Sequence, residues 1–283
     1  MSEQPDQDEI IRRILVALDA SPHSLAALRA AAELAANMDA ELLGMFVEDI
    51  NLLRLAELPF ARQVSSFSAE PRSLSREQVE QQLRSQARTA RRAMENLVGS
   101  SRLRWSFRVT QGVIAGELLS AAEQTDLIIL GKAGWSHGRR LGSTARLVVT
   151  QAASNALVLQ HGVQLGLPVG VVFDGSPQSQ RALEIAARLL RRREAYHLLV
   201  VLLAGDAEQA RYLQGGVTRW LRSRDLQASY RWLLERSGKK LAAMIEGERQ
   251  RCMLVLPAES QFLPPETILD LLNHTECPVL VVR

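Results

Sequence analysis

The sequence repeats itself once, and this repeat constrains the fold more than any other feature. Six residues that follow an apolar run near the N-terminus recur in the same order at a constant offset of 155 residues. They are Asp19, Ser21, Pro22, Ser24, Ala27 and Leu28, which return as Asp174, Ser176, Pro177, Ser179, Ala182 and Leu183. Two long copies indicate a duplicated domain and not a solenoid. We therefore expect one domain over residues 1–162 and a second over 167–283.

The two copies also end alike, and each alternates short apolar runs with helical periodicity. DLIILG at 126–131 is echoed by CMLVLP at 252–257, and NALVLQ at 155–160 by CPVLVV at 277–282. Strands separated by helices pair in parallel through right-handed crossovers. The sequence predicts an α/β protein with two doubly wound, mainly parallel five-stranded sheet domains in tandem. The expected strands are 14–18, 41–47, 105–109, 127–130 and 157–159, then 169–173, 197–203, 228–233, 253–256 and 279–282.

Composition excludes several classes of function. The 34 Lys and Arg residues are interleaved with 31 Asp and Glu, giving a formal net charge of only +3, so we expect no nucleic-acid partner. No apolar run approaches the roughly 20 residues that span a bilayer, and the polar N-terminus is unlike a secretory signal. Cys252 and Cys277 lie in apolar surroundings without metal-ligand spacing. We expect a cytoplasmic protein with reduced cysteines and no membrane partner.

A candidate anion site follows the fourth apolar run of the first half. Gly131 ends that run, Gly134 comes three residues later, and Gly142, Ser143 and Thr144 open the next helix. Glycines let a ligand approach the backbone, and the N–H groups of a helix N-terminus favour a phosphate. In an open parallel sheet, ligands bind beyond the carboxyl ends of the strands. The alternative is that the glycines only terminate the strand and that Ser143 is an ordinary helix cap; both interpretations stay open.

Several basic residues belong to the same loop. Lys132, His137, Arg139 and Arg140 bring positive or potential positive charge to it, although solvated surface is the plainer interpretation for the arginines. His137 and His23 have no identifiable partner of the Ser/His/Asp or metal-binding kind. We assign neither histidine a catalytic role.

Both halves resemble the universal stress protein family, over residues 12–160 and 167–283. In the first half the resemblance depends on VALDAS at 16–21, on QGVIAGELLSAAEQTDLIILG at 111–131 and on GKAGWSHGRRLGST at 131–144. The last segment is similar to the family's nucleotide loop, G-x2-G-x9-G-[ST]. It has seven residues between Gly134 and Gly142 where the family pattern has nine. The resemblance implies a fold of the HUP class, which is Rossmann-like.

The resemblance also implies a ligand, namely ATP or a related adenine nucleotide in the N-terminal half. Asp19 would hold the ribose, Ala17 and Val47 would line the adenine, and the glycine loop would hold the phosphates. From the residues alone, Asp19 is equally well explained as an Asx turn at the helix entry. The function implied is a stress-response binding module. The alternative is a structural or protein-interaction module of the same fold that binds no nucleotide.

Enzymatic activity has weaker support. No general base or acidic pair for Mg²⁺ can be assigned, and the Walker sequence G-x-x-x-x-G-K-[ST] is absent. The dinucleotide motif G-x-G-x-x-G does not follow the first strand of either half. We expect at most a slow ATPase, and the sequence leaves a role for Mg²⁺ open.

The second half is expected to keep the fold and to lack the site. After its fourth strand the chain reads PAESQFLPPETILD, which has no glycine and three prolines without N–H groups. The resemblance also implies that the halves pair through their last strands, for which Leu157–Leu159 and Val279–Val281 are suitable edge partners. We therefore expect the halves to form an internal pseudo-dimer, with further homodimerisation and a protein partner left open.

One connection, residues 49–73, is long and apolar. Leu52, Leu53, Leu55, Leu58 and Phe60 predict a short helix packed over the sheet edge. The alternative is a lid or a partner surface, with Phe67 at a mobile tip.

Overall fold

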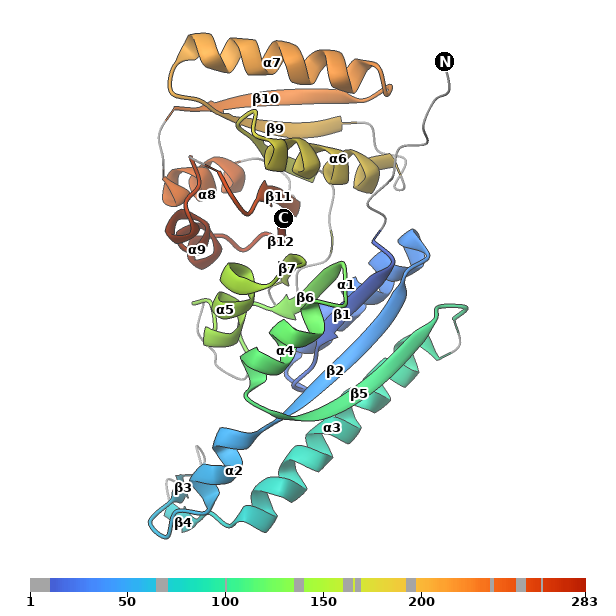
Figure 1. Ribbon diagram of the computed structural model, residues 1–283, viewed down its shortest axis with the longest axis vertical. Coiled ribbons are helices and arrows are strands. Elements are labelled where there is room, and N and C mark those ends of the chain that lie inside the picture. The colour runs from blue at the N-terminus through green and yellow to red at the C-terminus, as the bar shows by residue number, and fades with distance from the viewer. Residues whose placement is uncertain are drawn as a thin grey trace.

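The computed structural model describes residues 11–64, 71–99, 101–134, 140–159, 165, 169–191, 197–234, 237–247, 253–260 and 262–283. These residues form a ten-stranded sheet that runs through both halves of the chain, with helices on its two faces (Figure 1). The expected α/β architecture is confirmed.

The two halves of the sheet have the same strand order. The first runs β5-β2-β1-β6-β7 and the second β10-β9-β8-β11-β12. In each half the strand that comes first in the sequence, β1 or β8, lies at the centre, and β5 or β10 lies at the outer edge. Within each half all pairs are parallel. The strands of the first half are β1 (Arg13–Ala17), β2 (Glu41–Asp49), β5 (Trp105–Gly112), β6 (Leu127–Gly131) and β7 (Asn155–Leu159). Those of the second are β8 (Val169–Phe173), β9 (His197–Leu203), β10 (Gln227–Leu233), β11 (Met253–Pro257) and β12 (Val279–Val282).

Two hydrophobic clusters cover the two faces of the sheet. One contains the buried sides of α1 (Pro22–Met38), α3 (Arg76–Val98), α6 (Pro177–Arg191) and α7 (Ala207–Arg222). The other contains those of α4 (Ile114–Ala122), α5 (Ser143–Gln151), α8 (Gly238–Glu246) and α9 (Pro265–His274). The central strands are apolar on both sides: in β1, Ile14 and Val16 face the first cluster and Leu15 faces the second. Such double-sided burial explains why these strands are continuous apolar runs in the sequence.

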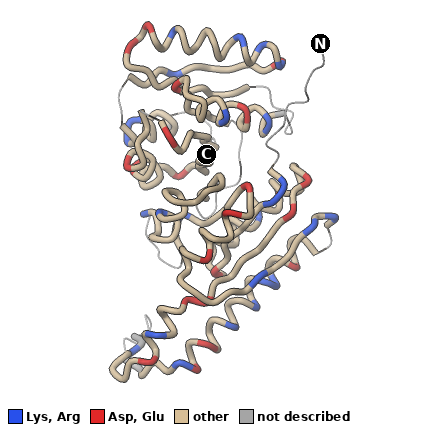
Figure 2. Tube along the Cα trace, in the orientation of Figure 1, with Lys and Arg blue, Asp and Glu red and all other residues tan. Residues whose placement is uncertain are grey.

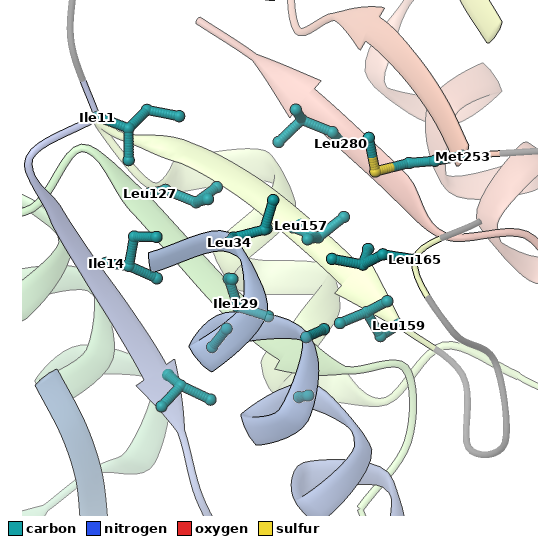
Figure 3. Close-up of a cluster of buried hydrophobic side chains, with 14 of the residues drawn as sticks. Ile11, Ile14, Leu34, Leu127, Ile129, Leu157, Leu159, Leu165, Met253 and Leu280 are labelled. Carbon is teal, nitrogen blue, oxygen red and sulfur yellow. The ribbon is translucent and has the colours of Figure 1, made fainter. Parts of the chain in front are cut away.

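The halves are joined through their last strands. β12 pairs antiparallel with β7, in the register Val279 with Val158, Leu280 with Leu157 and Val281 with Ala156. Figure 3 shows Leu157 of β7 and Leu280 of β12 in one buried cluster with Leu165 and Met253. The predicted pairing of Leu157–Leu159 with Val279–Val281 is confirmed, and it leaves neither strand as a free sheet edge.

Residues 49–73 form a helix and a hairpin. The predicted short helix is α2 (Ile50–Ala56), which buries Leu53 and Ala56 and contacts α3 and β5. The sequence did not predict the antiparallel hairpin of β3 (Arg62–Val64) and β4 (Pro71–Ser73) that follows. These elements lie at one extreme end of the molecule (Figure 1). Phe67, named as a mobile tip, lies outside the described residues.

Charge is mixed along the helices. Figure 2 shows blue and red residues interleaved along α3, where Arg76 pairs with Glu80, and Arg91 with Glu95, across one helical turn. Among the described residues, no helix combines the length and hydropathy that a membrane crossing requires.

Candidate functional site

A cavity of about 320 Å³ lies past the carboxyl ends of β1, β2 and β6, against the N-terminal turns of α4 and α5. All the residues predicted for the site line this cavity: Ala17, Asp19, Val47, Gly131, Gly134, Gly142, Ser143 and Thr144. They come from three strand ends and one helix start, brought together because parallel strands end at the same side of a sheet. Occupation by a nucleotide stays a prediction.

The acidic turn between β1 and α1 has its own hydrogen bonds. Asp19 Oδ1 accepts the N–H of Ser21 at 2.9 Å, and Ser21 caps α1 by accepting the N–H of Ser24 at 3.2 Å. Between them, Ala20 has φ of 59°, in the left-handed region. A Cβ placed on Gly134 would lie 2.8 Å from Asp19 Oδ2, so this second oxygen faces the glycine loop. Asp19 forms the Asx turn and also lines the cavity, and its two interpretations are compatible.

The three glycines of the loop differ in how much space surrounds the position where a Cβ would lie. A Cβ on Gly131 would lie 2.8 Å from His23 Cβ and 3.0 Å from the His23 carbonyl carbon, because β6 ends against α1. Gly134 is confined only by the carboxylate of Asp19. At Gly142 the nearest atom, Lys132 O, would be 3.5 Å away, which is ordinary contact. Gly131 is therefore required for packing, whereas Gly134 controls the space inside the cavity.

The start of α5 differs from the alternative interpretation in which Ser143 is an ordinary helix cap. Gly142 is the N-cap and Ser143 is the first helical residue, so no side chain caps this helix at its N-cap position. The helices α4 and α9 likewise lack a side-chain cap, whereas α1, α3, α7 and α8 are each capped by a serine or an aspartate. The Gly142 N–H donates to Lys132 O at 2.8 Å and draws the two ends of the loop together. The positive end of α5 is thus set against the cavity.

Lys132 does not direct its charge into the loop as expected. Its side chain is only 5% exposed, and Nζ donates to the carbonyl oxygens of Thr275 at 3.0 Å and Asn273 at 3.4 Å. Both acceptors belong to the second half, at the C-terminal end of α9, where the helix dipole favours a cation. His137 and Arg139 lie outside the described residues, and Arg140 is exposed.

Apolar side chains complete one wall, and sequence reasoning missed most of them. Met45 lies two residues before Val47 on β2, and Ile114 and Leu118 come from α4. The alternation of β2 could have indicated Met45, because residues two apart share a face. A wall of this kind suits an aromatic base more than a charged group. Among the described residues, no three His, Cys, Asp or Glu side chains form a group that could hold a metal ion.

The corresponding region of the second half is occupied by its own side chain. Asp174 repeats the turn, accepting the Ser176 N–H at 2.9 Å, with Gly175 at φ of 85°. The Ser260 hydroxyl donates to Asp174 Oδ2 and accepts the N–H groups of Phe262 and Leu263. Burial acts to raise the pKa of Asp174, but hydrogen bonds from Ser176, Ser260 and Ser179 outweigh it and hold the pKa below its ordinary value. The absence of a phosphate loop from this half stays a prediction.

The fold and the position of the cavity define a doubly wound α/β protein of the Rossmann-like class. The profile described as the universal stress protein family matches residues 11–160, more than half of the chain. The chain belongs to the universal stress protein family.

Solved structures agree with this fold over nearly the full length. A universal stress protein from Archaeoglobus fulgidus DSM 4304 is similar with a TM-score of 0.73 and 15% identity, covering 96% of each chain. One described as a putative universal stress protein from Pseudomonas aeruginosa UCBPP-PA14 has a TM-score of 0.61 and 13% identity, covering 96% of this chain and 93% of its own. A functionally unknown protein from Pseudomonas aeruginosa PAO1 has a TM-score of 0.58 and 15% identity, covering 96% and 92%. No curated protein matches the sequence.

Proposed function

We propose that the N-terminal half binds ATP or a related adenine nucleotide, and that the chain acts as a regulatory binding module of the stress response. The observation that supports this proposal best is the convergence of all the predicted site residues on one cavity. That cavity has an apolar side, an acidic edge and an uncapped helix N-terminus. These three features complement the base, the ribose hydroxyls and the phosphates of a nucleotide.

Each part of the ligand has a proposed place. The base would lie against Ala17, Met45 and Val47, where it removes apolar surface from water. The ribose hydroxyls would donate to the Asp19 carboxylate. The phosphates would accept the N–H groups of Ser143 and Thr144, where the α5 dipole stabilises negative charge.

The proposal is binding without rapid hydrolysis. Asp19 is the acidic side chain of the lining, and it already accepts a hydrogen bond in the turn. A general base must lie within hydrogen-bond reach of the attacking water. Among the described residues, the lining offers no second carboxylate for that role, so any ATPase activity is expected to be slow. If Mg²⁺ accompanies the nucleotide, we expect the phosphates and water to supply most of its ligands.

An interaction module without nucleotide is the alternative, and one observation favours it. Leu55, Leu58 and Phe60 are exposed at the projecting end of the molecule, Phe60 by 75%. Exposed apolar side chains that lie together often mark a surface for another protein. This alternative requires no ligand in the cavity.

Thermal unfolding with ATP separates the two functions. At an ATP concentration about 100 times Kd, binding stabilises the folded state by about 2.7 kcal/mol, so the melting temperature should rise by several degrees. Gly134→Val should abolish the rise, because its Cβ would displace the Asp19 carboxylate and its methyl groups would occupy the cavity. Each measurement is made with and without Mg²⁺.

Gly216→Val is the matched control, because nothing lies within 4 Å of a Cβ at that position in α7. It should leave the melting temperature unchanged or raise it slightly, because valine has a somewhat higher helix propensity than glycine, and it should leave the ATP-dependent rise intact. An unchanged melting temperature for the wild-type protein at millimolar ATP, with no heat of binding by calorimetry, would exclude the nucleotide proposal and favour the interaction module.

A further inference from the structure

The C-terminal end of α9, in the second half, contacts both ends of the glycine loop in the first half. Lys132 follows Gly131 directly, and its ammonium donates to the carbonyl oxygens of Asn273 and Thr275. Leu141 precedes Gly142 directly, and its N–H donates to Asn273 Oδ1 at 2.9 Å. These three hydrogen bonds connect residues more than 130 positions apart in the sequence.

The two loop residues that make these contacts, Lys132 and Leu141, are both buried. Lys132 is almost fully buried, and a buried ammonium is tolerated only when its charge is solvated by acceptors such as these carbonyl oxygens. The Leu141 side chain is buried in the cluster that α5 and α9 share. Its N–H is therefore held at a fixed place by Asn273. The next residue, Gly142, begins the segment of α5 that lines the cavity.

We infer that Asn273 is a positioning residue for the anion-binding loop, so that the site of the first half is complete only with the second half docked. This inference rests on the proposed function and extends it. Asn273 does not line the cavity; it acts through Leu141 and Gly142 on the amides of Ser143 and Thr144.

Loss of the Asn273 contact should lower the fraction of molecules whose loop has the conformation that binds the nucleotide. When only a fraction of the protein is competent, the apparent Kd rises in inverse proportion to that fraction. The Asn273 contact is one hydrogen bond, and losing it should raise Kd roughly three- to tenfold. By reciprocity, bound nucleotide should strengthen the contact and hold the two halves together more firmly.

The inference also gives the second half a role. Its own Asp174, the counterpart of the proposed ribose acceptor Asp19, is engaged by Ser260, so this half is not expected to bind a nucleotide itself. Its last helix nevertheless ends against the loop of the other half. A copy that has no ligand of its own can in this way control the affinity of its neighbour.

Three variants of the full-length protein test the inference by calorimetric titration with ATP at 25 °C. Asn273→Ala removes the acceptor and should raise Kd three- to tenfold. Asn273→Asp keeps an oxygen for the Leu141 N–H and should stay within about twofold of the wild type. His274→Ala alters the adjacent, exposed residue, whose ring contacts Asp270 on the same helix, and should leave Kd unchanged. A residue that only stabilised the fold would lower the melting temperature without changing Kd.

Hydrogen exchange of the ligand-free protein supplies a second readout. In Asn273→Ala the amides of 141–145 should exchange faster, while those of β1 keep the wild-type rate. Equal Kd values for wild type and Asn273→Ala, with unchanged exchange, would overturn the inference and leave the proposed function intact. If the wild type takes up no ATP, the proposed function fails. The exchange rates alone then decide the positioning role: faster exchange at 141–145 upholds it, and unchanged exchange overturns it.

Discussion

The turn after the first strand of each half has the same conformation, but it costs the two halves different amounts of free energy. In the first half Asp19 is followed by Ala20 at φ of 59°, and in the second half Asp174 is followed by Gly175 at φ of 85°. The same backbone conformation places both carboxylates over the N-terminus of the following helix. A left-handed conformation costs an L-residue with a Cβ about 1–2 kcal/mol, and glycine avoids that cost. The first half therefore carries local strain beside its candidate site.

Ala20→Gly should stabilise the protein by about 0.5–1 kcal/mol. Relief of the left-handed strain exceeds the extra chain entropy that glycine loses on folding and the contact of one methyl group. Urea denaturation followed by circular dichroism measures the change. The reverse substitution, Gly175→Ala, should destabilise, because its Cβ would also lie 2.8 Å from Leu213 Cδ2. Destabilisation by Ala20→Gly would show that Ala20 contributes more through packing than it loses through strain.

At the scale of elements, the site depends on where β6 ends and where α5 begins. β6 stops against α1, and α5 begins after its N-cap Gly142, whose N–H donates to Lys132 O. The short loop is closed by one backbone hydrogen bond and fixed from outside by α9. A shortened loop of this kind can still present the helix N-terminus to a ligand, because the amides belong to α5 and not to the middle of the loop.

The packing of these elements predicts different costs for two glycine substitutions. Gly131→Ala should destabilise by about 1–3 kcal/mol, because its Cβ would overlap the backbone of His23, which cannot move without α1. Gly142→Ala should change stability by less than about 1 kcal/mol, since its Cβ meets only ordinary contacts. Thermal and urea denaturation without ligand measure both. Equal losses for the two variants would contradict the assignment of Gly131 to packing.

At the scale of the whole molecule, the two half-sheets behave as one structure. β7 and β12 are the inner edges of the halves, and their pairing makes both hydrophobic clusters continuous across the junction. Figure 3 shows side chains from both halves in contact there. Cooperative unfolding is expected when two domains share a buried interface of this kind.

Leu280→Ala tests that cooperativity. Leu280 is buried opposite Leu157, so its truncation should cost about 2–5 kcal/mol. Hydrogen exchange in low urea should show protection falling in β1 and β8 together. Val109→Ala, on the exposed edge strand β5, is the control and should cost well under 1 kcal/mol. Loss of protection confined to β8 would mean that the halves unfold independently.

The sequence alone determined the features that are local or repeated. Buried parallel strands are continuous apolar runs, so their positions were predicted to within one or two residues. The pairing of β7 with β12 was implied by the family resemblance. The glycines and the start of α5 were predicted as a site because they follow a strand end of a parallel sheet, whereas Ala17, Asp19 and Val47 were added by the resemblance.

Only the tertiary structure decided the contacts between residues that no local pattern connects. The hairpin β3–β4, the Met45 and Leu118 wall, the Ser260 hydroxyl on Asp174 and the α9 acceptors of Lys132 all depend on segments that meet only after folding. A side chain's type can be read from the sequence, but its hydrogen-bond partner is set by which surface is packed against it. For this reason the sequence could locate the loop, whereas the fold decided that its lysine turns toward the second half.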